Sequence, residues 1–377
     1  MRDAISVAAA LIVRNEERFL PGCLESLRDR VDEVVIVDTG SDDATVEIAT
    51  RAGVRLLHHT WNHDFAAARN TGLDAISCDW FLYIDADERL RLPNGGVLCD
   101  YIDPSAIAAY VRFRPKTGYT RYRETRLFRC DLRLRFAGRI HETMTPILRT
   151  VGASEGLPIA SSRVEIDHLG YDDDQFHKHL RNLPLLETAV QEHPDRVYYW
   201  YHLAETLDAL GRAGEALEAA ARGLDSAERD PSDKQRADAS MIRQIMARLL
   251  LGRGEDPLAL IDSGIARVPE DHGLRFLRGR ALLDMGRPIE ALDVAACLRR
   301  IDPDSLGDGL LAFDRSIFGE KACELAALAC LRLGRRRDAG GWFSEAARLA
   351  PDLLAYRVKA TALLGPAAAE DRRATHG

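Results

Sequence analysis

Two aspartates separated by one residue follow an apolar segment and are the residues best suited to chemistry. The segment at residues 80–84 runs directly into Asp85-Ala86-Asp87-Glu88. Carboxylates spaced in this way at the end of a buried strand can chelate one hard divalent cation, and oxygen ligands suit Mg²⁺ or Mn²⁺, which also bind phosphate oxygens. Such an ion can neutralise the charge of a departing nucleotide diphosphate. An ordinary acidic turn has the same sequence, so the interpretation depends on other segments.

Three further polar segments are expected near these aspartates. Asp38 follows an apolar segment at residues 33–37, and its carboxylate can accept hydrogen bonds from a ribose or a base. Residues 14–17 follow the first apolar segment, and residues 61–70 lead into a helix that carries Arg69, whose guanidinium suits a phosphate or can orient an aspartate. Ligands of α/β sheets bind at the carboxyl ends of the strands. The residues predicted to meet there with Asp85 are Asn15, Glu17, Asp38 and Arg69.

The elements that must position these residues alternate between strand and helix patterns. Strands that are apolar throughout and joined by helices indicate a parallel-type sheet with helices on both faces. Alternating arginine and apolar residues at 112–114 and 133–136 predict antiparallel strands with one solvated face further along the chain. The strand patterns lie at residues 5–13, 33–37, 54–58 and 80–84, and the helix patterns at residues 18–29, 41–52 and 65–76.

From about residue 195 the strand patterns stop, and helical stretches recur with a Gly-Arg pair between them. The pair occurs at Gly211, Gly252, Gly286 and Gly334, and the step from Gly252 to Gly286 is 34 residues, the length of a TPR repeat. The other steps are longer. We therefore predict a TPR-like solenoid with a concave face rather than a regular array. A plain helical cap is the alternative interpretation.

The whole chain limits the classes of protein that it can belong to. The net charge of -8 argues against a general nucleic-acid-binding protein. The seven cysteines are scattered and never arranged as C-x-x-C, which indicates reduced, cytoplasmic thiols. The apolar run at residues 4–13 is too short to span a bilayer, so we expect no transmembrane segment. The predicted domains are an α/β domain at 1–190, an all-α TPR-like domain at 195–364 and a disordered tail at 365–377.

The ordered motifs N-E-E, L-x-x-C-L-x-S-L, D-E-V-V-I-V-D-T-G-S-x-D-x-T, W-x-x-D-F-A-x-A-R-N and D-A-D-E resemble those of family 2 glycosyltransferases. The TPR-bearing branch that includes glycocin-type peptide S-glycosyltransferases is the most similar. The resemblance is dense over residues 5–90 and thinner at 126–129, 138–142 and 168–171. It implies a GT-A fold, an inverting mechanism, a divalent cation (Mn²⁺ or Mg²⁺) and a nucleotide-sugar donor, most often a UDP-sugar. The implied acceptor is a peptide, a protein or a natural product.

The resemblance also implies roles for individual residues. Asp38 would contact the nucleoside, Asp87 would bind the metal, and Asp85 would assist through the ribose or the metal. His168, which precedes Leu169-Gly170-Tyr171, matches a late histidine that completes the metal or diphosphate site in GT-A enzymes. Arg126, within the family-like motif R-L-F-R, is expected in the donor site.

Inversion also needs a base that takes the proton of the acceptor on the side opposite the leaving group. Glu142 is the predicted base, because an acidic residue at a comparable point in the chain order has this role in GT-A enzymes. In this chain His141-Glu142 stands where the family has Glu-Asp. His141 is therefore an alternative base, or it orients Glu142 or binds phosphate. The helical domain is expected to recognise the acceptor or to form a homodimer.

Three other functions remain as alternatives. A sugar nucleotidyltransferase would need a glycine-rich, basic phosphate loop after the first strand, where this chain has Arg-Asn-Glu-Glu. A glycosidase would need two carboxylates that flank a sugar cleft without a nucleotide site. A non-catalytic scaffold, in which the solenoid does the work, would have no reason to retain acidic residues at 85, 87 and 142.

Overall fold

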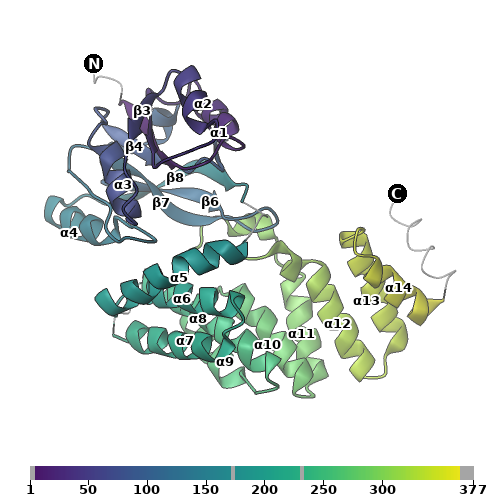
Figure 1. Ribbon diagram of the computed structural model, residues 1–377. Coiled ribbons are helices and arrows are strands. Elements are labelled where there is room, and N and C mark those ends of the chain that lie inside the picture. The colour runs from purple at the N-terminus through teal and green to yellow at the C-terminus, as the bar shows by residue number, and fades with distance from the viewer. Residues whose placement is uncertain (1–4, 171–174, 230–232, 366–377) are drawn as a thin grey trace. The chain divides into compact units, whose positions relative to one another are not determined.

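The computed structural model describes residues 5–170, 175–229 and 233–365, which form two compact units. The N-terminal unit consists of Met1–His193 together with Gly307–Ala312, and the helical unit consists of Pro194–Leu306 and Phe313–Gly377. The predicted fold class, an α/β part followed by an all-α part, is confirmed (Figure 1). Residues 366–377 of the predicted tail lie outside the described ranges.

The N-terminal unit is built on a mixed sheet with the strand order β3-β2-β1-β4-β7-β6-β8-β5. Strands β1 to β4 are parallel to one another, as the apolar strand patterns predicted. Strand β7 is antiparallel to both β4 and β6, and β5 is antiparallel to β8. The strands are β1 (Val7–Val13), β2 (Glu33–Asp38), β3 (Arg55–His58), β4 (Trp80–Tyr83), β5 (Glu88–Arg91), β6 (Ala108–Arg114), β7 (Tyr122–Arg129) and β8 (Ile159–His168).

Helices cover both faces of this sheet because its central strand is apolar on both sides. Successive side chains of a strand point to opposite faces. On one face, Leu20 and Leu27 of α1 share a buried cluster with Leu11 of β1. On the other face, Leu73 of α3 packs with Ala8 of the same strand. The helices of this unit are α1 (Leu20–Leu27), α2 (Thr45–Arg51), α3 (Phe65–Leu73), α4 (Thr145–Glu155) and α5 (Gln175–Glu192), with the short 3-10 helix η1 (Leu98–Tyr101).

One of the two predicted antiparallel strands is wrong. Residues 112–114 do lie in β6, which pairs with β7, but residues 133–136 belong to no strand. Asn70 of α3 takes both backbone groups of Phe136, since its Nδ2 donates to the carbonyl oxygen and its Oδ1 accepts from the N–H, each at 3.0 Å. A side chain therefore occupies the hydrogen bonds that a neighbouring strand would have used.

The helical unit consists of consecutive antiparallel helices, and three of the four predicted turn glycines lie where the Gly-Arg pattern placed them. Gly211, Gly286 and Gly334 have φ values of 76°, 72° and 73°, a left-handed conformation that glycine adopts without strain. The exception is Gly252, which is the last residue of a helix, and Gly254 makes the turn with φ 73°. The helices are α6 (Val197–Ala209), α7 (Ala213–Ala227), α8 (Asp233–Gly252), α9 (Leu258–Arg267), α10 (His272–Asp284), α11 (Pro288–Leu298), α12 (Glu320–Arg332), α13 (Arg336–Leu349) and α14 (Leu354–Leu364), with η2 (Pro303–Leu306) and η3 (Arg315–Phe318) between α11 and α12.

A short segment between η2 and η3 belongs to the N-terminal unit. The backbone N–H of Arg123 in β7 donates to the carbonyl oxygen of Gly309 at 2.7 Å. The guanidinium of Arg112 in β6 binds the carboxylate of Asp308 through two hydrogen bonds of 3.0 and 3.2 Å. The chain therefore passes between the two units three times, which no sequence pattern indicated.

Two absences follow from the described part of the chain. Among its helices, none combines the length and the apolar character that a membrane span needs. None of the seven cysteines forms a disulfide.

Candidate active site

Asp38 lies at the end of β2, level with Val13 of β1 and His58 of β3. Its side chain is almost fully buried, with 4% of the residue exposed. The carboxylate accepts hydrogen bonds from the backbone N–H groups of Gly40 and Ser41, each at 3.1 Å, and Nδ1 of His58 lies 3.4 Å from Oδ2. Gly40 has a φ of 105°, so the turn that folds these N–H groups back onto Asp38 favours glycine. The carboxylate is therefore held in place at the predicted ligand-binding edge.

Asn15 and Glu17 join the loop after β1 to the loop after β2. The side-chain Oδ1 of Asn15 accepts a hydrogen bond from the backbone N–H of Asp42 at 2.9 Å. The backbone N–H of Asn15 donates to Oγ of Ser41 at 2.9 Å. Oε2 of Glu17 accepts from the N–H of Ala44 at 3.0 Å. Both side chains thus hold the backbone beside Asp38, and their predicted contact with a nucleotide stays a prediction.

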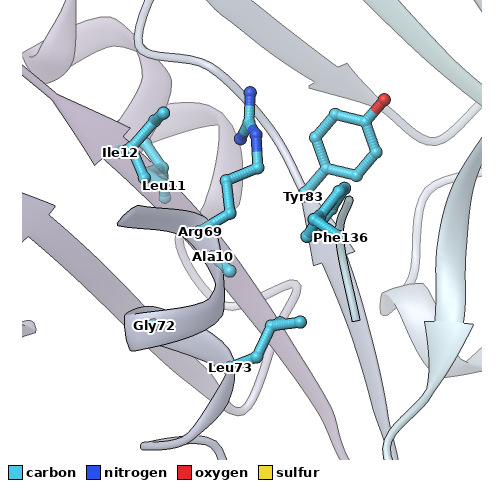
Figure 2. A pocket seen from close by; sticks show the side chains of 8 residues that line it. All are labelled: Ala10, Leu11, Ile12, Arg69, Gly72, Leu73, Tyr83 and Phe136. Atoms are coloured by element: carbon cyan, nitrogen blue, oxygen red, sulfur yellow. The ribbon is translucent and has the colours of Figure 1, made fainter. Parts of the chain in front are cut away.

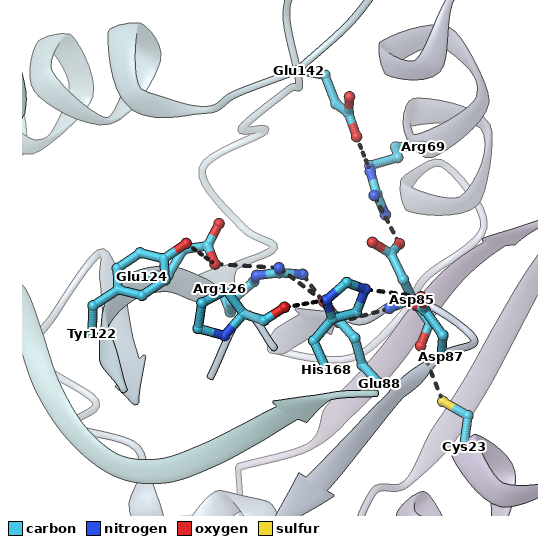
Figure 3. Close-up of polar contacts among 11 residues, drawn as sticks. Cys23, Arg69, Asp85, Asp87, Glu88, Tyr122, Glu124, Arg126, Glu142 and His168 are labelled. Carbon is cyan, nitrogen blue, oxygen red and sulfur yellow. Dashed lines mark hydrogen bonds and ion pairs between the residues drawn. The ribbon is translucent and has the colours of Figure 1, made fainter. Parts of the chain in front are cut away.

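Arg69 of α3 connects the first aspartate of the pair to the predicted base. Its Nη2 donates to Oδ1 of Asp85 at 2.9 Å, and its Nε donates to Oε1 of Glu142 at 2.5 Å (Figure 3). Only 8% of the arginine is exposed, and its guanidinium lies 4.7 Å from the ring centroid of Tyr83. Three sequence-predicted residues that are far apart in the chain are therefore brought into one hydrogen-bonded group.

A small cavity lies beside this group (Figure 2). It is lined by apolar residues of β1 and α3 together with Arg69, Tyr83 and Phe136.

Burial raises the pKa of Asp85, but the charges of Arg69 and Arg126 outweigh it, and the net effect lowers that pKa. Asp85 therefore remains a carboxylate at neutral pH.

Asp87 and His168 form the second polar pair of the site. Nε2 of His168 lies 2.8 Å from Oδ2 of Asp87, and Nδ1 lies 2.6 Å from the carbonyl oxygen of Pro115. Burial lowers the pKa of His168, but the hydrogen bond and the charge of Asp87, with the Pro115 carbonyl, raise it to about 9. The two residues lie close because β5, which follows Asp87, pairs with β8, which ends in His168.

The donor set fits a divalent cation in part. A carboxylate and an imidazole, as offered by Asp87 and His168, are ligands that Mn²⁺ accepts. The carboxylate of Asp85 is directed instead toward Arg69, and within the described ranges no three potential ligands converge on one point. Asp87 and His168 are therefore the residues that would hold the ion, together with oxygens of a bound diphosphate.

Arg126, predicted to lie in the donor site, is buried behind the aspartates. Only 5% of the residue is exposed, and its guanidinium makes two hydrogen bonds of 3.0 and 3.2 Å to the carboxylate of Glu88. Glu88 also accepts from the N–H of Asp85 at 2.9 Å. Burial raises the pKa of Glu88 to about 7, although the charge of Arg126 opposes this. Arg126 thus supports the turn that carries the two aspartates.

His141 directly precedes Glu142 and has a φ of 49°. A left-handed conformation is uncommon for residues other than glycine and is found frequently at functional sites. The backbone is therefore strained at His141, directly before Glu142.

Four residues around the site were not predicted from the sequence: His58, Tyr83, Glu88 and Glu124. His58 could have been found, because parallel strands in register bring the end of β3 next to Asp38. Glu88 directly follows the two aspartates, but its partner Arg126 is in a strand whose place in the sheet the sequence did not indicate. Tyr83 and Glu124 had no signal beyond their strand patterns.

Known proteins resemble this chain in both units. Residues 9–153 match the model of glycosyl transferase family 2. A TPR repeat-containing protein of Synechococcus elongatus is 36% identical over 234 residues, which are 60% of this chain and 58% of that protein. The SPbeta prophage-derived glycosyltransferase SunS of Bacillus subtilis is 24% identical over 306 residues, which are 77% of this chain and 70% of SunS. A structure of glucosyl-3-phosphoglycerate synthase from Mycobacterium tuberculosis with Mn²⁺ and uridine diphosphate covers 50% of this chain and 79% of that chain, with 15% identity and a TM-score of 0.36.

The chain thus spans less than two thirds of the Synechococcus protein. The family match runs from β1 into α4 and includes both Asp38 and Glu142. Together with the TPR-containing relative, it agrees with the predicted combination of a family 2-type glycosyltransferase domain with TPR-like helices. Residues 9–153, within the N-terminal unit, are thus similar to glycosyl transferase family 2.

Proposed function

We propose that this chain is an inverting glycosyltransferase that moves a sugar from a nucleoside diphosphate sugar to an acceptor. The expected donor is a UDP-sugar. The observation that carries the proposal is the bridge from Asp85 through Arg69 to Glu142. It links the carboxylate of Asp85, beside the expected diphosphate site, to the carboxylate expected to take a proton, within the residues that match glycosyl transferase family 2.

The residues of the chain have distinct roles in this proposal. Asp38 binds the nucleoside at the ends of β1 and β2. Arg69 fixes the orientation of Glu142, and Glu142 takes the proton of the acceptor as the sugar is transferred. A divalent cation, when bound by Asp87 and His168, neutralises the charge that develops on the diphosphate.

The helical unit is proposed to recognise a peptide, protein or natural-product acceptor, or to form a homodimer. Stacked helices present an extended surface that suits such partners. Hydrogen exchange of α6 to α14 with and without acceptor, together with light scattering, tests the two roles. If hydrogen exchange of the helices is unchanged by acceptor and the protein is a monomer, the helical unit has neither role.

We also propose that the protein is located in the cytoplasm, as expected from its reduced thiols.

The test of the activity is a donor screen. The full chain is incubated with UDP-, GDP- and dTDP-sugars in the presence of Mn²⁺ or Mg²⁺, and release of the nucleoside diphosphate is measured. We expect slow metal-dependent hydrolysis of one nucleotide class, and calorimetric binding of the same nucleotide. Absence of both hydrolysis and nucleotide binding would favour the non-catalytic scaffold.

A further inference from the structure

Tyr83 is held rigidly between the two arginines of the candidate site. Its ring centroid lies 4.7 Å from the guanidinium carbon of Arg69 and 4.2 Å from that of Arg126. The ring also contacts Phe136 edge-on, with centroids 5.3 Å apart. Two cation–π contacts, together with aromatic packing, restrict the orientation of the ring.

The hydroxyl group of Tyr83 makes no hydrogen bond in the part of the chain that the structure describes. Figure 2 shows this oxygen and the guanidinium of Arg69 at the same end of the cavity, away from Leu73. A tyrosine hydroxyl keeps its proton at neutral pH. A fixed hydroxyl that can donate and accept is therefore directed toward the site.

Glu124 of β7 offers a second unused group, beside Arg126. Its Oε2 accepts hydrogen bonds from Arg126 and from the hydroxyl of Tyr122, each at 3.3 Å. Its Oε1 has no hydrogen bond within the described residues, and Figure 3 shows it pointing away from both partners. The side chain is 29% exposed, so this oxygen can be reached by a ligand.

We propose that Tyr83 and Glu124 form a subsite that binds hydroxyl groups of the sugar carried by the donor. This inference rests on the proposed glycosyl transfer. A sugar hydroxyl both donates and accepts, so it can donate to Oε1 of Glu124 and accept from the Tyr83 hydroxyl. The subsite lies beside Arg69, which connects the diphosphate side of the site to the predicted base, and this is where the transferred sugar must lie.

The charges around the subsite favour an uncharged sugar. Arg69 is already paired with Asp85 and Glu142, and Arg126 is paired with Glu88 and Glu124. The charge of each guanidinium is therefore already compensated by carboxylates of the chain, and the charge of Glu124 repels a sugar carboxylate. The donor expected from the structure carries a neutral pyranose rather than a uronic acid.

The first experiment compares UDP with the UDP-sugar found in the donor screen, using calorimetry on the full chain. Tyr83→Phe removes only the hydroxyl and keeps the ring between the arginines. We expect its affinity for the UDP-sugar to fall by about 2- to 13-fold, as for one hydrogen bond, with unchanged affinity for UDP. The matched control is Tyr110→Phe, because Tyr110 also stacks on an arginine, Arg123, but lies on β6 outside the group. The control should bind both ligands as the unmodified chain does.

Two results of this experiment would overturn the subsite. Equal losses for UDP and UDP-sugar in Tyr83→Phe would show that the hydroxyl supports the fold of the site, and no loss would show that it does not touch the sugar. If the unmodified chain binds no nucleotide at all, the proposed function itself fails, which is a distinguishable outcome.

The second experiment tests the preference for uncharged sugars. Glu124→Gln removes the negative charge at nearly the same shape. We expect the ratio of affinities for a UDP-hexose over the corresponding UDP-uronic acid to fall by about tenfold in this variant. An unchanged ratio would remove Glu124 from the subsite.

Discussion

Nε of Arg69 lies 2.5 Å from Oε1 of Glu142, so the candidate base is held by an arginine that is itself almost fully buried. The same guanidinium reaches Asp85 through Nη2. The positions of Asp85 and Glu142 are thereby coupled through one side chain. The planar guanidinium makes this possible, since its several donors point in fixed directions.

Replacing Glu142 by glutamine should affect turnover far more than donor binding. The amide keeps the size of the side chain but cannot take a proton, and general-base catalysis contributes typically ~10²–10⁴-fold. We expect kcat to fall by about that factor in steady-state transfer assays, with UDP affinity little changed. Glu155→Gln, on the exposed end of α4, is the control. A kcat close to that of the unmodified chain would move the role to His141.

Arg69→Lys should impair both donor binding and turnover. A lysine keeps the charge, but its three donors share one nitrogen, so it cannot reproduce the separate positions of Nε and Nη2 that hold Glu142 and Asp85. Misplacement of a catalytic group by about 1 Å can cost about 10²-fold, and we expect a loss of this order in kcat/KM. Kinetics with varied donor at saturating acceptor measure both effects. A variant with unchanged parameters would show that the bridge does not matter for the reaction.

Asp87→Asn should abolish metal-dependent donor binding. The change removes a charge from the pair that would hold the cation, and His168 loses its partner at 2.8 Å. We expect Mn²⁺ to strengthen UDP binding to the unmodified chain and to have no effect on the variant, as measured by calorimetry. Asp74→Asn, an exposed residue paired with Arg135, controls for the loss of one carboxylate. Full transfer in excess EDTA would contradict the metal assignment.

The positions of β1 to β4 could be predicted because each is a mainly apolar run that ends at or just before a polar residue. Parallel strands in register then bring Asp38 and Asp85 to the same edge whatever lies between them. Helix α3 was predictable for a similar reason, and with it the placement of Arg69. These parts of the site depend on local sequence patterns alone.

The rest of the site depends on contacts between distant segments. The pairing of Glu88 with Arg126 arises because β7 lies next to β4 in the sheet, and no periodicity reveals that order. The strand predicted at residues 133–136 is absent because Asn70 occupies the backbone of Phe136. A polar side chain on a helix can make the backbone hydrogen bonds that a neighbouring strand would otherwise make. The alternating sequence of polar and apolar residues is the same in both cases.

The helical unit should lose stability in mild acid because of His272. This residue begins α10, is buried, and packs against Phe313 and Phe318 with centroids 5.1 and 5.5 Å away. Burial, and to a lesser extent the charge of Arg275, lowers its pKa from 6.5 to about 4. Between these values the unfolded chain binds a proton that the folded chain does not, so stability falls as the pH falls from about 6.5 toward 4.

We expect this one residue to reduce the free energy of unfolding of the helical unit by about 1–3 kcal/mol between neutral pH and about pH 4.5. Denaturant titrations at several pH values measure the loss. His272→Gln cannot titrate, so the variant should show a correspondingly smaller dependence on pH. The same slope in both proteins would assign the acid sensitivity to other groups.

The segment Gly307–Ala312 has a consequence for how the protein is made. It supplies hydrogen bonds to β6 and β7 from a position beyond α11, although both strands are synthesised much earlier. Domains generally fold during synthesis in order from the N-terminus. Here β6 and β7 of the N-terminal unit lack these contacts until most of the helices have been translated. The N-terminal unit can therefore complete its folding only after the ribosome has synthesised Gly307–Ala312.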